Sequence, residues 1–364
     1  MTNREKEILE LIKKNPMISQ KDLADILGIT RSSVAVHITN LQKKGYILGK
    51  GYIVKEGEYV SIVGGANVDI QGFPKEKFIL KDSNPGYVKT SLGGVGRNIG
   101  ENLARLGVYT KLITVIGDDA NGNNILENAR SVGLDMEHSM KLKGDSTSTY
   151  LALLNEKGDM EAAVSSMDIF DNMTVDFIEG KKAIIENSKV CVIDTNIPQD
   201  VIKFIITNFK GVPFFLDTVS TSKARKVKDV IGYFHTIKPN KYEAELLSGM
   251  EINSKDDVKK AAEIFLDKGV KRVFITLGEK GVYYNDGVNE NFIKNPKVNI
   301  VSATGAGDAF DAGLVYCYLN DFNIEKTAYF SMAASILTLL HENTINPNMS
   351  EDNINKLIKE LKLC

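Results

Sequence analysis

The chain has 364 residues, of which 43% are hydrophobic and 25% charged, with a formal net charge of −2. These values are typical of a globular protein of two or three domains and argue against a disordered, fibrous or nucleic-acid-coating chain. Widely spaced cysteines exclude a disulfide or zinc framework, and the absence of an eighteen-residue apolar run or a leader-like start predicts a cytoplasmic protein without membrane contact.

The first 56 residues are basic, with ten Lys or Arg against six Asp or Glu, whereas the remainder carries 35 against 41. Apolar periodicity in this segment predicts one helix over residues 4–14, a second between Ser19 and Gly28, and a third capped by Thr30. Two β-prone runs around residues 49–51 predict a hairpin. The order resembles the winged helix-turn-helix domains of bacterial transcription regulators.

A domain of this kind would place its third helix in the major groove of DNA, with short polar side chains near the bases and lysines near the phosphates. A helical dimerisation or docking module has the same apolar periodicity and stays open as an alternative. The predicted DNA-binding residues are Arg31, Ser32, Ser33, Lys43, Lys44 and Lys50.

From residue 59 the pattern changes to a buried strand and a glycine turn, with Asn67 and Asp69 just beyond it. Open α/β sheets bind ligands at the carboxyl ends of such strands, although Asp69 taken alone could also cap a turn. A second glycine-rich turn, residues 93–98, leads into a helical pattern but lacks the spacing of a dinucleotide fingerprint or a Walker A loop. Its glycines allow a ligand to approach the backbone, next to the amide of Asn98.

The rest of the chain alternates apolar strand-like runs with helical segments, which predicts a mostly parallel sheet flanked by helices. Residues 70–91 and 146–165 are β-prone and rich in turns, and we expect them to form a separate small sheet. The predicted domains are therefore an α+β domain over residues 1–56 and an α/β domain over residues 57–364. The strand-like runs are residues 190–193, 214–216, 272–276 and 282–284.

The segment Ser302-Ala-Thr-Gly-Ala-Gly-Asp308 precedes an apolar helical run. Bare backbone amides at a helix N-terminus bind anions, and a carboxylate beside them can take a proton from a bound hydroxyl. Phosphoryl transfer needs both features, because amides stabilise the charge on the moving phosphate and a base orients the nucleophile. Taken alone, the segment is equally compatible with ordinary helix capping.

Three motifs occur together in this chain: residues 93–107, Asn240-Lys-Tyr-Glu243 and Thr304-Gly-Ala-Gly-Asp308. In this order they resemble the signature motifs of the ribokinase-like (PfkB) family of sugar and nucleoside kinases, over about residues 58–360. The resemblance implies a ribokinase-like α/β sandwich with a small β-sheet lid from about residues 70–91 and 146–165. It also implies ATP and Mg²⁺ as cofactors and a hydroxymethyl group as the phosphoryl acceptor.

The resemblance further implies functions for individual residues. It makes Asp308 the catalytic base, with the amides of Gly305, Ala306 and Gly307 as the anion hole, and it gives Glu243 the placement of Mg²⁺ through water. The implied substrate-binding residues are Asn67, Asp69, Gly94, Asn98 and Asn196. The implied ATP-binding residues are Asn240, Thr276, Gly278, Gly281 and Gly307.

Within the family, residues 64–69, 82–86, 93–99 and 146–150 resemble the pseudouridine kinases, and the Asp-Ser-Asn-Pro-Gly run at 82–86 is unusual in ribokinases and fructose kinases. This implies phosphorylation of pseudouridine at its 5′-hydroxyl, with the lid over the nucleobase. A homodimer is expected because the lids of this family often pair and winged helices usually bind DNA as dimers. A kinase for another ribonucleoside or for ribose, and a transcription regulator that only senses its ligand, are the alternatives.

One departure from the family pattern concerns the last motif, where Ser302 and Ala303 replace the usual Asp-Thr. In relatives that Asp helps to bind a monovalent cation beside the anion hole. The replacement leaves K⁺ binding open, although backbone carbonyls around Thr304 and residues 344–346 offer substitute ligands.

Overall fold

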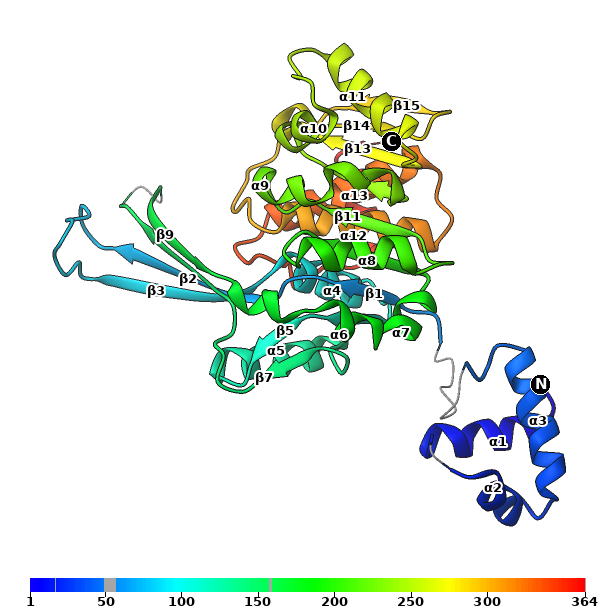
Figure 1. Cartoon of the computed structure of the whole chain (residues 1–364). Coiled ribbons are helices and arrows are strands. Elements are labelled where there is room, and N and C mark those ends of the chain that lie inside the picture. The colour runs from blue at the N-terminus through cyan, green and yellow to red at the C-terminus, as the bar shows by residue number, and fades with distance from the viewer. Residues whose placement is uncertain (17, 49–56, 157–158, 364) are drawn as a thin grey trace. The chain divides into compact units, whose positions relative to one another are not determined.

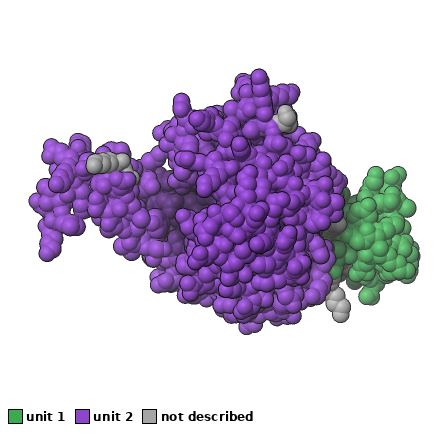
Figure 2. Space-filling model, turned by 90° about the horizontal axis from the view of Figure 1, so that it is seen from above, with its two compact units in different colours: residues 1–58 green, residues 59–364 purple. Residues whose placement is uncertain are grey.

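A computed structural model describes residues 1–16, 18–48, 57–156 and 159–363. They form two compact units, residues 1–58 and 59–364, which Figure 2 colours green and purple. Within these described ranges, no helix is long and apolar enough to cross a membrane.

The N-terminal unit contains the helices α1 (Asn3–Lys14), α2 (Gln20–Leu27) and α3 (Arg31–Lys43). Both predicted N-caps are confirmed, because Ser19 Oγ accepts a bond from Asp22 N and Thr30 Oγ1 accepts one from Ser33 N. The predicted hairpin falls on residues 49–56, which lie outside the described residues. The three helices share one apolar core, which includes Ile8, Ile12, Leu23, Val34, Ile38 and Leu41.

The second unit is built on a nine-stranded sheet. Its strands are β1 (Val60–Val63), β4 (Thr110–Ile113), β6 (Leu134–Asp135), β10 (Val190–Asp194), β11 (Phe214–Asp217), β12 (Thr236–Ile237), β13 (Arg272–Thr276), β14 (Val282–Asn285) and β15 (Glu290–Ile293). They lie in the order β15-β14-β13-β12-β11-β10-β1-β4-β6. Among the described strands of this sheet, the pairs β13–β14 and β14–β15 are antiparallel and the others are parallel. The four predicted strand runs and the mostly parallel sheet are confirmed.

Alternate side chains of the parallel strands enter two separate cores. In β10, Val190 and Val192 belong to one core, and Cys191 and Ile193 to the other. Because successive residues of a strand point to opposite faces, both faces must be covered by helices, as Figure 1 shows.

The first core is covered by α4 (Val95–Arg105), α5 (Ala120–Val132), α12 (Ala306–Leu319), α13 (Ile324–Leu339) and α14 (Glu351–Glu360). The second is covered by η1 (Asp168–Asn172), α6 (Val175–Glu179), α7 (Lys182–Glu186), α8 (Gln199–Asn208), α9 (Thr221–Ala224), η2 (Arg225–Tyr233), α10 (Lys241–Ser248) and α11 (Lys255–Asp267). The same unit also contains the short helix η3 (Gly278–Lys280) and a two-stranded sheet of β5 (Val115–Gly117) and β7 (Met140–Leu142).

A separate four-stranded sheet projects from the body of this unit (Figure 1). It consists of β2 (Asn67–Pro74), β3 (Gly86–Gly93), β8 (Thr149–Leu154) and β9 (Met160–Ser166), in the order β3-β2-β8-β9. The predicted small sheet is thus confirmed. Cross-strand pairing places Asp69, Ser91 and Tyr150 on one of its faces.

Candidate active site

The buried carboxylate of Asp194 organises the glycine turns of the site. Asp194 ends β10, and its Oδ2 accepts bonds from Gly65 N at 2.8 Å and Gly96 N at 2.7 Å. A Cβ on Gly64 would lie 2.4 Å from the same oxygen, so only glycine allows this approach. Burial raises the pKa of Asp194 to about 6. The carboxylate thereby joins the β1–β2 turn to the start of α4, the two segments that carry Asn67, Asp69 and Asn98.

Asn67 and Asp69 lie together at the start of β2, since Asn67 Nδ2 donates to Asp69 Oδ1 at 2.6 Å. Burial raises the pKa of Asp69, while the bond from Asn67 and the charge of Arg97 oppose the shift. Gly94 is the N-cap residue of α4 and lies against the backbone of Gly65. The glycine turns therefore bring these three predicted substrate residues into one neighbourhood.

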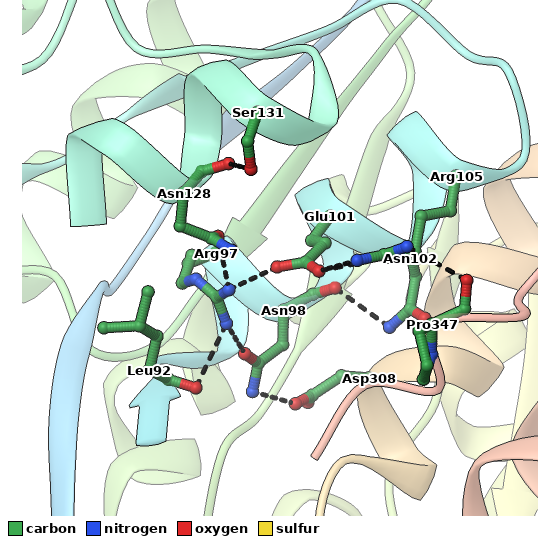
Figure 3. A network of polar contacts seen from close by, with 10 residues as sticks. All are labelled: Leu92, Arg97, Asn98, Glu101, Asn102, Arg105, Asn128, Ser131, Asp308 and Pro347. Atoms are coloured by element: carbon green, nitrogen blue, oxygen red, sulfur yellow. Dashed lines mark hydrogen bonds and ion pairs between the residues drawn. The ribbon is translucent and has the colours of Figure 1, made fainter. Parts of the chain in front are cut away.

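Asp308 lies in the first turn of α12 and contacts the predicted substrate residue Asn98, whose Nδ2 donates to Asp308 Oδ2 at 2.8 Å (Figure 3). Only 9% of Asp308 is exposed. Burial, followed by the charge of Asp217, raises the pKa of Asp308 to about 7, against the bond from Asn98 and the charge of Lys238. A carboxylate with this pKa can accept and release a proton near neutral pH.

The predicted anion hole lies beside Asp308. Gly305 is the N-cap residue of α12, and Ala306 and Gly307 open the helix, where backbone N–H groups lack intrahelical acceptors. A Cβ on Gly307 would lie 3.2 Å from the ammonium of Lys238. A cation and free amides therefore meet at the helix start, as a phosphoryl group requires.

Lys238 belongs to a buried charge cluster that the sequence analysis missed. Its Nζ lies 3.2 Å from Asp217 Oδ2 and 3.0 Å from Asp311 Oδ2. Burial opposes the charge of Lys238, but the two carboxylates outweigh it and raise its pKa. Burial raises the pKa of Asp311 well above its usual range, whereas Lys238 holds the pKa of Asp217 low despite burial. One buried ammonium thus lies between two buried carboxylates.

Asn196 is held from two sides. Its backbone N donates to Asp194 Oδ1 at 2.8 Å, and its side-chain Oδ1 accepts a bond from Lys223 Nζ at 2.5 Å. A Cβ on Gly65 would lie 2.8 Å from Asn196 Nδ2. The structure therefore places Asn196 at the same glycine turn that carries Asn67 and Asp69.

The predicted ATP residues lie further along the sheet. Asn240 and Glu243 form a capping box at the start of α10, and Glu243 Oε2 also accepts a bond from Thr218 Oγ1 at 2.7 Å. Asn240 pairs with Thr276 at the end of β13. Together with Gly278 these two residues line a cavity of about 690 Å³.

Two other predicted ATP-binding residues, Gly281 and Gly307, are not among the residues that line this cavity. Gly281 is the C-cap residue that follows η3, and it packs closely against the carbonyl of Ile293. Gly307 lies next to the ammonium of Lys238.

The residues present fit a metal that arrives with a phosphate ligand. Among residues 1–16, 18–48, 57–156 and 159–363, no group of three or more His, Cys, Asp or Glu side chains is placed to hold a metal by itself. Glu243 is a buried carboxylate that uses Oε2 for both its bonds to Asn240 N and Thr218. A single hard carboxylate with water and phosphate ligands is typical of Mg²⁺.

In the N-terminal unit, Arg31, Ser32, Ser33 and Lys43 are exposed on α3. Lys44 is engaged within the unit, because its Nζ contacts both carboxylate oxygens of Glu5, at 2.9 and 2.8 Å. Its ammonium is thus drawn toward a buried carboxylate, which the sequence analysis did not foresee. Lys50 lies outside the described residues.

Comparison with known proteins supports the predicted family of each unit. Residues 58–351 match the pfkB family of carbohydrate kinases, and residues 1–47 match a winged helix-turn-helix DNA-binding family. The chain is 38% identical to the uncharacterized sugar kinase YeiI of Escherichia coli (strain K12), over 98% of this chain and 99% of that protein. It is 37% identical to the pseudouridine kinase of the same strain, over 84% of this chain and 98% of that protein.

A crystal structure of a putative sugar kinase from Clostridium perfringens is 42% identical and superposes with a TM-score of 0.76, over 85% of this chain and 96% of that one. The predicted ribokinase-like α/β fold is therefore confirmed. The chain belongs to the pfkB family of carbohydrate kinases and carries an N-terminal winged helix-turn-helix domain.

Proposed function

We propose that this kinase transfers the γ-phosphoryl group of ATP to the 5′-hydroxyl of pseudouridine, which gives pseudouridine 5′-phosphate and ADP. The observation that carries the proposal is Asp308, a buried carboxylate whose pKa is raised to about 7 beside the open amides of α12. The match to a pseudouridine kinase over nearly the whole length of that protein supports the choice of nucleoside.

In the proposed reaction, Asn98 holds Asp308 Oδ2, and the second carboxylate oxygen accepts the proton of the 5′-hydroxyl. The 5′-oxygen then forms a bond to the γ-phosphorus as the bond from that phosphorus to the β-phosphate oxygen breaks, and ADP leaves. The amides of Gly305, Ala306 and Gly307 stabilise the charge on the moving phosphoryl group.

The remaining residues bind the two substrates in this proposal. Asn67, Asp69, Gly94, Asn98 and Asn196 hold the ribose hydroxyls, and Asn240 with the loop from Thr276 to Gly281 holds ATP. Glu243 would hold Mg²⁺ through water, and the ion would supply positive charge against the phosphates of ATP.

The test is an ADP-release screen of the full chain with Mg²⁺-ATP and each of pseudouridine, uridine, the other ribonucleosides, ribose and fructose. We expect pseudouridine to give the highest kcat/KM, and phosphorus NMR should place the new phosphate on the 5′-oxygen. If ribose were the best substrate by far, the assignment of the nucleoside would be wrong. Binding of a nucleoside without ADP release would favour a sensor that retains the kinase fold.

A second proposal concerns the N-terminal unit, which we infer binds DNA and regulates genes linked to the kinase reaction. The match of residues 1–47 to a winged helix-turn-helix family and the exposed polar start of α3 support this proposal. Arg31, Ser32 and Ser33 would face the bases, and Lys43 a phosphate.

Binding of the full chain to DNA from upstream of its own gene should weaken steeply with salt, because each neutralised phosphate releases counterions. Lys43→Gln should reduce the slope of log K against log salt by about 0.9, the value for one lost phosphate contact. Lys44→Gln is the matched control and should change the slope less, because the ammonium of Lys44 lies on Glu5. Binding that is absent or independent of salt would favour a docking module.

A further inference from the structure

Arg97 is a buried cation within the candidate active site. The proposed reaction assigns it no function. It lies in the first turn of α4, directly before Asn98, and only 4% of it is exposed. Burial of an arginine is costly unless its donors are bonded, so its partners indicate its purpose.

The guanidinium of Arg97 contacts four groups from three elements (Figure 3). Nη1 donates to the carbonyl oxygen of Leu92, at the end of β3, at 3.1 Å and to Asn98 Oδ1 at 2.9 Å. Nη2 donates to Asn128 Oδ1 on α5 at 2.7 Å and pairs with Glu101. One planar group therefore joins the projecting sheet, α4 and α5.

The bond to Asn98 fixes which way its amide points. Arginine has only donors, so the atom of Asn98 beside Nη1 must be the oxygen, and the amide nitrogen must point away from Arg97. That nitrogen is the atom that donates to Asp308 Oδ2. In an amide turned by half a rotation, an oxygen would face the carboxylate of Asp308 and a nitrogen would face the guanidinium.

The charge of Arg97 is only partly neutralised by its own ion pair. Glu101 is shared, because its Oε1 also accepts bonds from Arg105 Nε at 3.0 Å and Nη2 at 2.7 Å. The three side chains thus carry two positive charges and one negative charge. The charge of Arg97 interacts with both Asp69 and Asp308.

We propose that Arg97 is a positioning residue for the phosphoryl transfer, which locks the Asn98 amide toward Asp308 and ties the end of β3 to the helix that carries this amide. The proposal rests on the proposed function, since it takes Asp308 as the base. In this proposal, the guanidinium of Arg97 aligns the catalytic base Asp308 with the residues that bind the ribose hydroxyls. Asn98 is the contact between Arg97 and Asp308.

The test must distinguish the effect of Arg97 on the pKa of Asp308 from the effects of the other charged groups nearby. They come from Asp194, Asp217 and Lys238 at the carboxyl ends of β10, β11 and β12, and from Arg97 on α4. On α12 itself, Asp311 contacts Lys238. Only Arg97 is changed in the experiment, and the sheet and α12 groups remain constant.

The decisive comparison is Arg97→Met against Arg105→Met. Each removes one arginine from Glu101 and leaves the other to neutralise it, but only Arg97 contacts Asn98 and Leu92. For Arg97→Met we expect kcat to fall about 10- to 100-fold, the range for lost hydrogen bonds to a charged group. The acid limb of its pH profile should move to higher pH, because loss of a nearby positive charge raises the pKa of Asp308.

Arg105→Met should keep both kcat and the acid limb near wild type. Arg97→Lys should keep the acid limb, because the charge remains, yet lose kcat, because an ammonium lacks the planar fork. If Arg97→Met matched Arg105→Met in kcat and in pH profile, the positioning proposal would be wrong. If the wild-type chain released no ADP with any nucleoside, or if Asp308→Asn stayed active, the proposed function itself would fail instead.

Discussion

Asp308→Asn should reduce kcat by about 10²- to 10⁴-fold, the contribution typical of a general base. The amide has the size of the carboxylate and can still accept the bond from Asn98 Nδ2, but it cannot take a proton from the 5′-hydroxyl. Nucleoside affinity, measured by calorimetry, should therefore change little while ADP release is nearly lost. A turnover close to wild type would assign the base to another group.

The pH dependence of the wild-type enzyme provides an independent check on Asp308. Burial and the charge of Asp217 raise its pKa to about 7, so the base is protonated below that pH. kcat should therefore rise as pH increases through about 7, and the residual activity of Asp308→Asn should lack this acid limb. Thermal unfolding of the variant controls for folding, and we expect no loss of stability because a neutral amide is easier to bury than a carboxylate.

Much of the fold could be predicted from the sequence because its signals are local. The strands β10, β11, β13 and β14 are apolar runs, and the helix starts at Ser19 and Thr30 are short-range capping patterns. The motif that ends at Asp308 is local too, since anion hole and base are consecutive residues of one helix start. Such features depend on few contacts between distant parts of the chain, so apolar periodicity and motif order are sufficient to predict them.

The contacts that orient the site depend on tertiary structure and were missed for that reason. Lys238 meets Asp217 and Asp311 only because β11, β12 and α12 are neighbours in space. The sequence nevertheless contained a signal for Asp194 and Asp217, because each is an acidic residue at the carboxyl end of a buried strand. The same position in the sheet had indicated a ligand site near Asp69.

In the N-terminal unit, too, a tertiary contact could not be predicted from the sequence pattern. Lys44 and Glu5 are 39 residues apart in the chain, and only the packing of α1 against α3 brings them into contact. The sequence pattern places Lys44 in a basic run, next to Lys43, and does not distinguish the two ammonium groups. The structure distinguishes them by the burial of Glu5, of which only 1% is exposed.

Gly305→Ala should abolish most activity through the backbone alone. Gly305 has a φ of 81° at the N-cap of α12, and a Cβ there would lie 1.9 Å from the carbonyl oxygen of Thr344. The neighbour is backbone, so either the segment around Thr344 or the start of α12 must move. Either movement displaces the amides of Ala306 and Gly307, and we expect kcat to fall about 10²- to 10³-fold, as for loss of an oxyanion donor.

Gly287→Ala is the matched control for this substitution. Gly287 has a φ of 84°, almost the same as that of Gly305, but a Cβ on it would have nothing within 4 Å. Both variants carry the strain of a left-handed alanine, about 1–3 kcal/mol, which thermal unfolding should report in each. Only Gly305→Ala adds the clash with Thr344, so only this variant should lose turnover. Equal kcat in the two variants would remove the start of α12 from the phosphoryl-transfer site.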